Sequence, residues 1–206
     1  MLEPGRANLV FRLKQQGLGD RLDDEARRRL LERIKQMEHQ GYDLEAADGT
    51  FELLARTAVD PDLHWFEVER YEVNVAADGL EPLQTNATVT LRVQGQQHSA
   101  AASGHGALHA LHTCLRTCLT KAYPQIKEAR LIDYKVRLLD ARKGTASKVR
   151  VLIEWADHLQ KWSTVGVSDN VVEASWIALL DALRLELMRV SQQGGSLQPS
   201  RVGAET

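Results

Sequence analysis

Cysteine and long apolar runs are both scarce in this sequence, and each scarcity excludes a class of protein. Only two cysteines occur in 206 residues, Cys114 and Cys118. They lie four apart in a stretch with helical periodicity, so we expect two reduced core residues of a cytoplasmic protein rather than a disulfide. No apolar run approaches the roughly 18 residues that a membrane-spanning helix needs, and the N-terminus lacks a secretory signal pattern. We therefore expect no membrane partner.

An excess of charge of either sign is also missing. The chain carries 26 Lys and Arg against 28 Asp and Glu, a formal net charge of −2. This balance argues against nucleic acid or an acidic membrane as the main partner. A hydrophobic fraction of 43% is ordinary for a globular protein and provides for a real core. The length suits one domain of typical size with a smaller appendage.

An internal repeat organises the chain. The stretch from Trp162 to Leu183, WSTVGVSDNVVEASWIALLDAL, repeats the pattern of Ser99 to Leu119, SAAASGHGALHALHTCLRTCL, about 64 residues earlier. Each copy reads as a short strand, a tight turn and an amphipathic helix, and the strands upstream repeat in the same register. Two copies are too few for a solenoid. The pattern instead predicts a domain with internal pseudo-twofold symmetry.

Residues 1–60 have helical rather than strand periodicity. We expect helices over residues 5–16, 23–40 and 44–57, with glycines ending the first two and Gly49 inside the third. Their combined core is thin, so independent folding of this segment is not expected. Asp60-Pro61-Asp62 marks the predicted boundary between the helical segment and the strands.

From residue 61 the apolar period changes to two. The first copy predicts strands over 66–75, with a bulge near Arg70, over 87–93 and over 98–102, followed by a helix after Gly106. The second predicts strands over 132–138, 149–155 and 162–167, with a turn at 143–145 and a helix capped by Asn170. The fold class is therefore α+β: two pseudo-symmetric βββα units over 61–192, preceded by three helices. The Gly- and Ser-rich tail, 193–206, is predicted to be disordered.

Several of these motifs resemble one known family. WSTVGVSDNVVEASWIALLDAL, GHGALHAL and LIDYKVRLLD followed by GTASKVRVLIE are similar to the C-terminal regulatory (allosteric and dimerisation) domain of citramalate and 2-isopropylmalate synthases, with the citramalate branch nearer. The segment GRANL…LLERIKQMEHQGYDLEAADGTFELL resembles the helical linker subdomain of these enzymes. The resemblance implies that residues 1–60 are a linker and 61–192 a regulatory domain.

The resemblance also implies a function. The family's acyltransferase chemistry, which condenses acetyl-CoA with pyruvate to citramalate in one branch, belongs to a (β/α)₈ barrel with a divalent metal. Such a barrel needs about 250 residues, so this chain is expected to be inactive alone, with no catalytic residue, metal or cofactor of its own. Its expected partners are a second copy, that barrel, and an end-product amino acid, isoleucine or leucine.

The family pattern carries an effector site over to both turns and one strand. Gly104 and Gly106 let the backbone approach a ligand, and the helix after them points free N–H groups outward, which suits a carboxylate. His109 is the departure, since a small or acidic residue would be easier to explain there. The implied effector-binding residues are Gly104, His105, Gly106, Leu108, His109, Leu131, Tyr134, Leu138, Gly166, Val167 and Ser168.

Plainer interpretations stay open. A Gly-x-Gly before a helix is often only a tight turn, and Leu131, Tyr134 and Leu138 could be strand core, where the tyrosine hydroxyl would need a polar partner. His105, His109 and His112 near the cysteines could hold a structural zinc ion, although no CxxC pair exists. The resemblance implies a sensor, a regulatory domain that binds isoleucine for feedback inhibition, or leucine in the 2-isopropylmalate branch. The alternatives to this sensor are a dimerisation module that binds no ligand and, against the charge balance, a small RNA-binding βββα domain.

Overall fold

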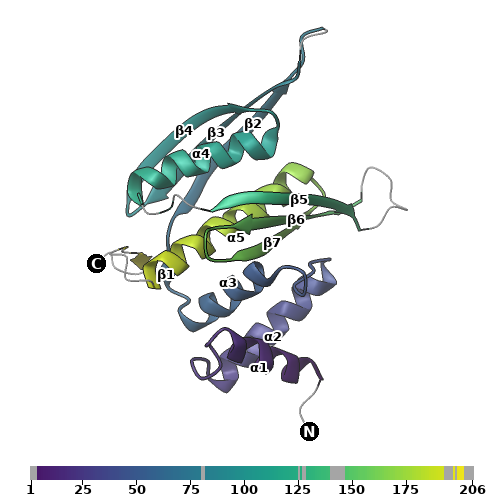
Figure 1. Ribbon diagram of the computed structural model, residues 1–206, viewed down its shortest axis with the longest axis vertical. Helices are drawn as coiled ribbons and strands as arrows, with labels where there is room; N and C mark the ends of the chain where they lie inside the picture. The colour runs from purple at the N-terminus through teal and green to yellow at the C-terminus, as the bar shows by residue number, and fades with distance from the viewer. Residues whose placement is uncertain are drawn as a thin grey trace. The chain divides into compact units, whose positions relative to one another are not determined.

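A computed structural model describes residues 4–79, 82–124, 126, 129–139, 147–192, 197 and 199–201. The predicted order is confirmed: three helices are followed by two successive units, each of three strands and a helix. Two further two-residue strands, Leu63–His64 and Ser200–Arg201, were not predicted. The elements labelled in Figure 1 are α1 (Pro4–Gln15), α2 (Asp24–His39), α3 (Asp48–Val59), β1 (Leu63–His64), β2 (Glu67–Ala76), β3 (Gln84–Val93), β4 (Gln96–Gly104), α4 (Ala107–Ala122), β5 (Arg130–Leu138), β6 (Val149–Ala156), β7 (Lys161–Ser168), α5 (Val171–Gln192) and β8 (Ser200–Arg201).

The chain forms two compact units. The first comprises residues 1–62, 131–156 and 160–185, so it joins the helical segment to the second βββα copy. The second comprises residues 63–130, 157–159 and 186–206, and it contains the first βββα copy. Helix α5 contributes to both, since the division falls after Leu185. The segment boundaries drawn from the sequence at residues 60 and 192 stay a prediction.

In the second unit an antiparallel sheet, in the order β2-β3-β4, carries α4 on one face. Strand β3 alternates as predicted, with Ala87, Val89, Leu91 and Val93 buried beneath the helix. The thiols of Cys114 and Cys118 are free and buried there, and Cys114 Sγ donates to the carbonyl of Ala87 at 3.3 Å. The predicted bulge in β2 is present between Val68 and Arg70.

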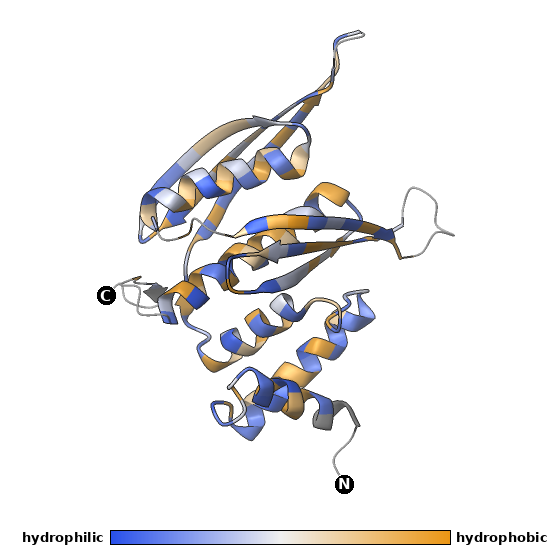
Figure 2. Ribbon diagram, viewed as in Figure 1, coloured by the Kyte–Doolittle hydropathy of each residue, from blue (hydrophilic) through white to orange (hydrophobic). Residues whose placement is uncertain are grey.

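In the first unit the sheet, in the order β5-β6-β7, has elements on both faces. The α5 face is marked by Thr164, whose Oγ1 donates to the carbonyl of Ala178 at 2.8 Å. The opposite face belongs to the helical segment: Arg150 Nε donates to the carbonyl of Gly41 at 2.6 Å, and Leu152 packs against the helical core. Because both faces are covered, no described residue of the central strand β6 is fully exposed: buried and half-buried residues alternate along most of its length. The hydropathy colours of Figure 2 show the sheet between these two covering layers.

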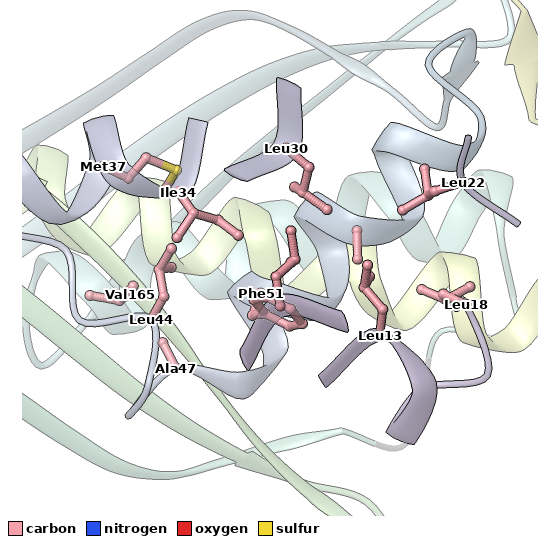
Figure 3. Packing of buried hydrophobic residues seen from close by; sticks show 12 residues of the cluster. Leu13, Leu18, Leu22, Leu30, Ile34, Met37, Leu44, Ala47, Phe51 and Val165 are labelled. Carbon is pink, nitrogen blue, oxygen red and sulfur yellow. The ribbon is translucent and has the colours of Figure 1, made fainter. Parts of the chain in front are cut away.

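The helical segment shares its core with that sheet. Leucines from α1 and α2 meet Phe51 of α3, and Val165 of β7 belongs to the same cluster (Figure 3). The guanidinium of Arg12 lies 3.6 Å above the centre of the Phe51 ring. The helices therefore bury their apolar faces with the help of the sheet, in line with the thin core that the sequence indicates. The buried members are Leu9, Leu13, Leu18, Leu22, Leu30, Ile34, Met37, Leu44, Ala47, Phe51, Ala55 and Val165.

The prediction of the third helix was wrong at its start. Residues 44–46 form a turn, and α3 begins at Asp48, so Gly49 lies in the first helical turn. A Cβ at Gly49 would meet the carbonyl oxygen of Ser163 at 2.8 Å, so the glycine is needed for close packing on β7. The predicted turn at 143–145 lies outside the described residues, as does most of the tail. Within the tail, Ser200–Arg201 pairs antiparallel with Leu63–His64.

Candidate functional site

The turn between β4 and α4 leaves a helix N-terminus open. Gly106 is the N-cap residue and supplies no side-chain hydrogen bond, and the first turn of α4 carries no acidic residue. His105 and His109 are exposed and stacked, with ring centroids 5.8 Å apart, and the backbone N–H of His105 donates to His109 Nδ1 at 3.3 Å. Leu108 is half-buried. The N–H groups of the first helical turn can therefore donate hydrogen bonds to an anionic ligand.

Two of the predicted glycines serve packing within the chain. A Cβ at Gly104 would lie 2.7 Å from the backbone nitrogen of Ala110, and one at Gly166 would lie 1.9 Å from the carbonyl oxygen of Ala174. In each copy, therefore, the strand approaches its own helix too closely for a side chain. Gly106 has open space where its Cβ would be, so it alone of the three faces no such neighbour.

The equivalent turn between β7 and α5 is filled by its own side chains. Asn170 caps the helix as predicted, with Oδ1 accepting from the backbone N–H of Val172 at 2.8 Å. Glu173, three residues after this cap, binds the turn through a serine rather than through the backbone N–H of Asn170. It accepts a hydrogen bond from Ser168 Oγ, which in turn accepts from the backbone N–H of Asn170 at 3.1 Å. With Val167 buried, this turn leaves its helix end less accessible than that of α4.

Strand β5 presents an apolar stripe on its α5 face. Ile132, Tyr134, Val136 and Leu138 expose between 37% and 56% of their surface. The Tyr134 hydroxyl has the polar partner that it was expected to need, Ser175 Oγ at 2.9 Å. Because successive residues of a strand point to opposite faces, Leu131 lies on the other face from Tyr134 and Leu138. The stripe suits an aliphatic group, and Leu131 does not belong to it.

The predicted site residues thus fall into two groups. Gly104, His105, Gly106, Leu108 and His109 lie together in the second unit. Leu131, Tyr134, Leu138, Gly166, Val167 and Ser168 belong to the first. Their roles as effector ligands stay a prediction.

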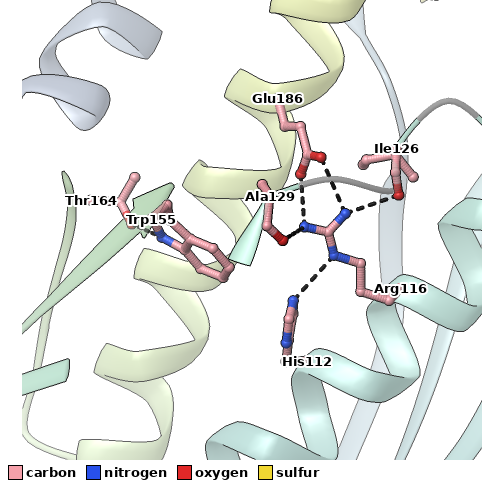
Figure 4. Close-up of polar contacts among 7 residues, drawn as sticks. All are labelled: His112, Arg116, Ile126, Ala129, Trp155, Thr164 and Glu186. Carbon is pink, nitrogen blue, oxygen red and sulfur yellow. Dashed lines mark hydrogen bonds and ion pairs between the residues drawn. The ribbon is translucent and has the colours of Figure 1, made fainter. Parts of the chain in front are cut away.

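One buried polar cluster was missed from the sequence (Figure 4). Arg116 of α4 pairs with Glu186 of α5 at 3.0 Å and donates to the carbonyls of Ile126 and Ala129 at 2.9 and 2.7 Å. Its Nε also donates to His112 Nε2 at 3.2 Å. Burial, followed by the Arg116 charge, lowers the pKa of His112 to about 4. This histidine is therefore neutral and structural. In the sequence, the signal for this cluster was an arginine next to helix positions that were expected to be buried.

A second set of missed residues covers the outer edge of β7. Asp48 Oδ1 accepts from the backbone N–H of Ser163 at 2.8 Å, and Thr50 Oγ1 accepts from that of Val165 at 3.0 Å. The Tyr42 hydroxyl lies beside the backbone of Val167, and burial raises the pKa of this tyrosine. Side chains of the helical segment therefore take the place of a neighbouring strand.

Asp181 of α5 adjoins this edge. Thr50 Oγ1 also donates to Asp181 Oδ2 at 3.3 Å. Burial raises the pKa of Asp181 to about 6, although the Arg184 charge and the Thr50 hydroxyl act in the opposite direction. The folded chain consequently favours the protonated acid more than the unfolded chain does.

Within the ranges given above, no three His, Cys, Asp or Glu side chains gather where a metal ion could be held. In those same ranges no helix has the length and apolarity that a membrane crossing requires.

Comparison with known proteins shows the family to which the chain belongs. A family model described as the LeuA allosteric (dimerisation) domain matches residues 45–186. The chain belongs to this family. The match begins just before α3 and ends within α5, at the Glu186 that pairs with Arg116, so it covers the first βββα copy and all of the second but the last residues of its helix.

Whole enzymes resemble this member of the LeuA domain family over nearly its full length. It is 42% identical to the (R)-citramalate synthase of Aquifex aeolicus over 191 residues, 92% of this chain, and 40% identical to that of Geobacter sulfurreducens over 194 residues, 93% of this chain. The 2-isopropylmalate synthase of Geobacillus stearothermophilus is more distant, at 24% over 193 residues, 92% of this chain. The chain spans only 36%, 37% and 35% of these relatives, respectively.

Proposed function

We propose that the chain is the regulatory part of a citramalate synthase, which binds isoleucine for feedback inhibition and joins two copies of the enzyme. The observation that carries this proposal is the 42% identity to a citramalate synthase across 92% of the chain, against 24% for a 2-isopropylmalate synthase. On this proposal the condensation of acetyl-CoA with pyruvate, and the divalent metal it uses, belong to a separate catalytic barrel. The regulatory part needs no cofactor and acts in the cytoplasm.

The open N-terminus of α4 supports amino-acid binding. A ligand carboxylate needs N–H donors and a positive potential, and the first turn of α4 offers both without a competing cap. The α5 N-terminus is less suitable, because Asn170 already accepts from Val172. On the proposal, the carboxylate binds at Gly106 and the next N–H groups of the helix, beside His105 and His109.

The apolar stripe of β5 supports an aliphatic ligand. Tyr134, Val136 and Leu138 are exposed on one face although they are apolar and close together. Exposed apolar surface of this kind commonly marks a binding site. Tyr134 and Leu138 are therefore a candidate surface of the first unit for an aliphatic group, and Leu131 is left out because it lies on the opposite face of the strand.

The covered β7 edge supports a route from the regulatory domain to the rest of an enzyme. Asp48 and Thr50 hydrogen-bond the strand backbone, so a shift of β7 must also shift α3. The helical segment would then transmit this displacement to the catalytic part of the enzyme. Coupling of this kind is a free-energy difference between two states of one element, and here that element is the joint between α3 and β7.

A thermal-unfolding scan of the chain with isoleucine, leucine, valine and threonine tests the proposal. Ligand at a hundred times its dissociation constant adds about 2.7 kcal/mol of stability. We expect an increase in the unfolding temperature with isoleucine. An increase with leucine alone would favour a 2-isopropylmalate synthase domain instead. No increase with any of the four would contradict the sensor and leave a dimerisation module.

A further inference from the structure

The two three-stranded sheets have four outer strands, and three of them are protected against pairing with another strand. Strand β2 carries a bulge and three charged residues within the stretch ERYE, and β5 carries Asp133, Lys135 and Arg137. The edge of β7 is covered by Asp48 and Thr50. Charges, bulges and covering side chains are the usual devices that keep sheet edges from associating.

Strand β4 has none of these devices. Its sequence, QQHSAAASG, contains no Lys, Arg, Asp, Glu or Pro, and its register with β3 is unbroken over nine residues. Its residues alternate between exposed and half-buried after two exposed glutamines. An edge strand of this length without charge is a ready template for backbone pairing.

The register identifies the backbone groups that face outward. Gln94 and Gly95, with φ of 50° and 76°, form a two-residue turn, so Val93 and Gln96 close the ladder as a hydrogen-bonded pair. Hydrogen-bonded and open pairs then alternate along an antiparallel ladder. The outward residues of β4 are therefore Gln97, Ser99, Ala101 and Ser103.

The internal repeat makes these positions informative. Ser99, Ala101 and Ser103 correspond to Ser163, Val165 and Val167 of β7, 64 residues later. In β7 the helical segment covers all three positions, through Asp48, Thr50 and Tyr42. In β4 no described residue hydrogen-bonds the outward backbone groups. The outward backbone groups of this edge are thus hydrogen-bonded within the chain in the second βββα repeat and left open in the first.

We propose that a second copy of this chain pairs with the open edge, β4 against β4 in antiparallel orientation, to form a continuous sheet across a twofold axis at Ala100. This inference rests on the self-association proposed above and names its surface. Ala100 is the central residue of Gln96–Gly104, so this register pairs the strand along its whole length.

The residues that meet in this register are compatible. Ser99 lies opposite the second copy's Ala101, and Gln97 opposite its Ser103. His98 meets Ala102, and Ala100 meets itself at a close, non-hydrogen-bonded position of about 4.5 Å between Cα atoms, where a small side chain is needed. No like charges oppose one another, which is the usual obstacle to symmetric strand pairing.

Two substitutions at Ala101 test the edge. Ala101→Pro removes an outward N–H that β3 does not use, so the sheet within one copy is retained while pairing between copies is lost. Ala101→Thr is the matched control, because it keeps the N–H and suits a strand. By sedimentation equilibrium of the full chain, we expect Ala101→Pro to raise the dimer dissociation constant about 100-fold or more and Ala101→Thr to leave it near wild type.

Amide hydrogen exchange provides a second readout if Ala101→Pro does not fold. In the wild-type dimer the amides of Ser99, Ala101 and Ser103 should exchange slowly and become fast on dilution, whereas those of His98, Ala100 and Ala102 stay slow throughout. Fast exchange at the first set in a dimer, or a dimeric Ala101→Pro, would overturn the edge pairing but not self-association. A wild-type chain that is monomeric at all concentrations would overturn self-association itself.

Discussion

Replacing Thr50 by valine tests how the helical segment is joined to the second sheet. Valine has nearly the shape of threonine, and Thr50 is fully buried, so the change removes one hydroxyl and little else. The backbone N–H of Val165 then loses its acceptor at 3.0 Å. A buried N–H without a partner costs about 1–3 kcal/mol. We expect Thr50→Val to lower the free energy of unfolding by about 2 kcal/mol, or the unfolding temperature by roughly 4–8 °C.

The same substitution should make stability more dependent on pH. Asp181 has a folded pKa of about 6 against an ordinary value of 3.8. Its contribution to stability is therefore complete below pH 3.8 and is lost as the pH rises through about 6. The Thr50 hydroxyl favours the ionised carboxylate, so removing it raises the folded pKa further. Thr50→Val should consequently cost more at pH 8 than at pH 5.

Urea unfolding at the two pH values, followed by tryptophan fluorescence, measures both effects. Thr50→Ser is the control: it keeps the hydroxyl, loses one methyl group worth about 0.8 kcal/mol, and should show the pH dependence of wild type. In an Asp181→Asn background the extra cost of Thr50→Val at pH 8 should vanish. A Thr50→Val protein within about 0.5 kcal/mol of wild type at both pH values would refute the hydrogen-bonded edge.

Three further predictions concern packing and charge. Gly166→Ala should destabilise the chain by about 3 kcal/mol or more, since its Cβ would lie 1.9 Å from a backbone oxygen of α5. Gly104→Ala should destabilise it less, and Gly106→Ala least, because there is open space at Gly106. Thermal unfolding of the three variants measures this ranking, and the reverse order would contradict it. Asp181→Asn should stabilise the chain at pH 8 but much less at pH 5, and equal effects in urea titrations at both would contradict the raised pKa. Arg116→Met should cost about 3–5 kcal/mol by leaving a buried carboxylate unpaired, and a near-neutral result by chemical denaturation would show that the cluster is dispensable.

Strand alternation and the repeat made the sheets predictable. Ala87, Val89 and Leu91 alternate with polar residues, so one face had to be buried, and the copy 64 residues later predicted the second sheet in the same register. The bulge near Arg70 was readable because a slip in the apolar alternation has no other simple cause. The cap at Asn170 was predictable because capping depends only on residues next to one another in the sequence.

The features that the sequence did not predict depend on residues far apart in the chain. Thr50 and Val165 are 115 residues apart, and Arg116 and Glu186 are 70 apart. No local periodicity reports such pairs, because they form only when separate elements dock. The predicted start of α3 at residue 44 differs from the observed start at Asp48, and the first turn of this helix also contacts a distant segment: Gly49 lies against the carbonyl of Ser163 in β7. Within the candidate site, the sequence analysis grouped Leu131 with Tyr134, although the alternation of side chains along a strand puts the two on opposite faces.

Titration of the labelled chain with isoleucine, followed by the backbone amide resonances, tests the central claim most directly. We expect saturable shifts at residues 105–109, where the N-terminus of α4 is open, and little change at residues 170–173, where Asn170 and Ser168 already occupy the helix end. Shifts confined to residues 170–173, or no shifts at millimolar isoleucine, would contradict the assignment of the effector carboxylate to α4.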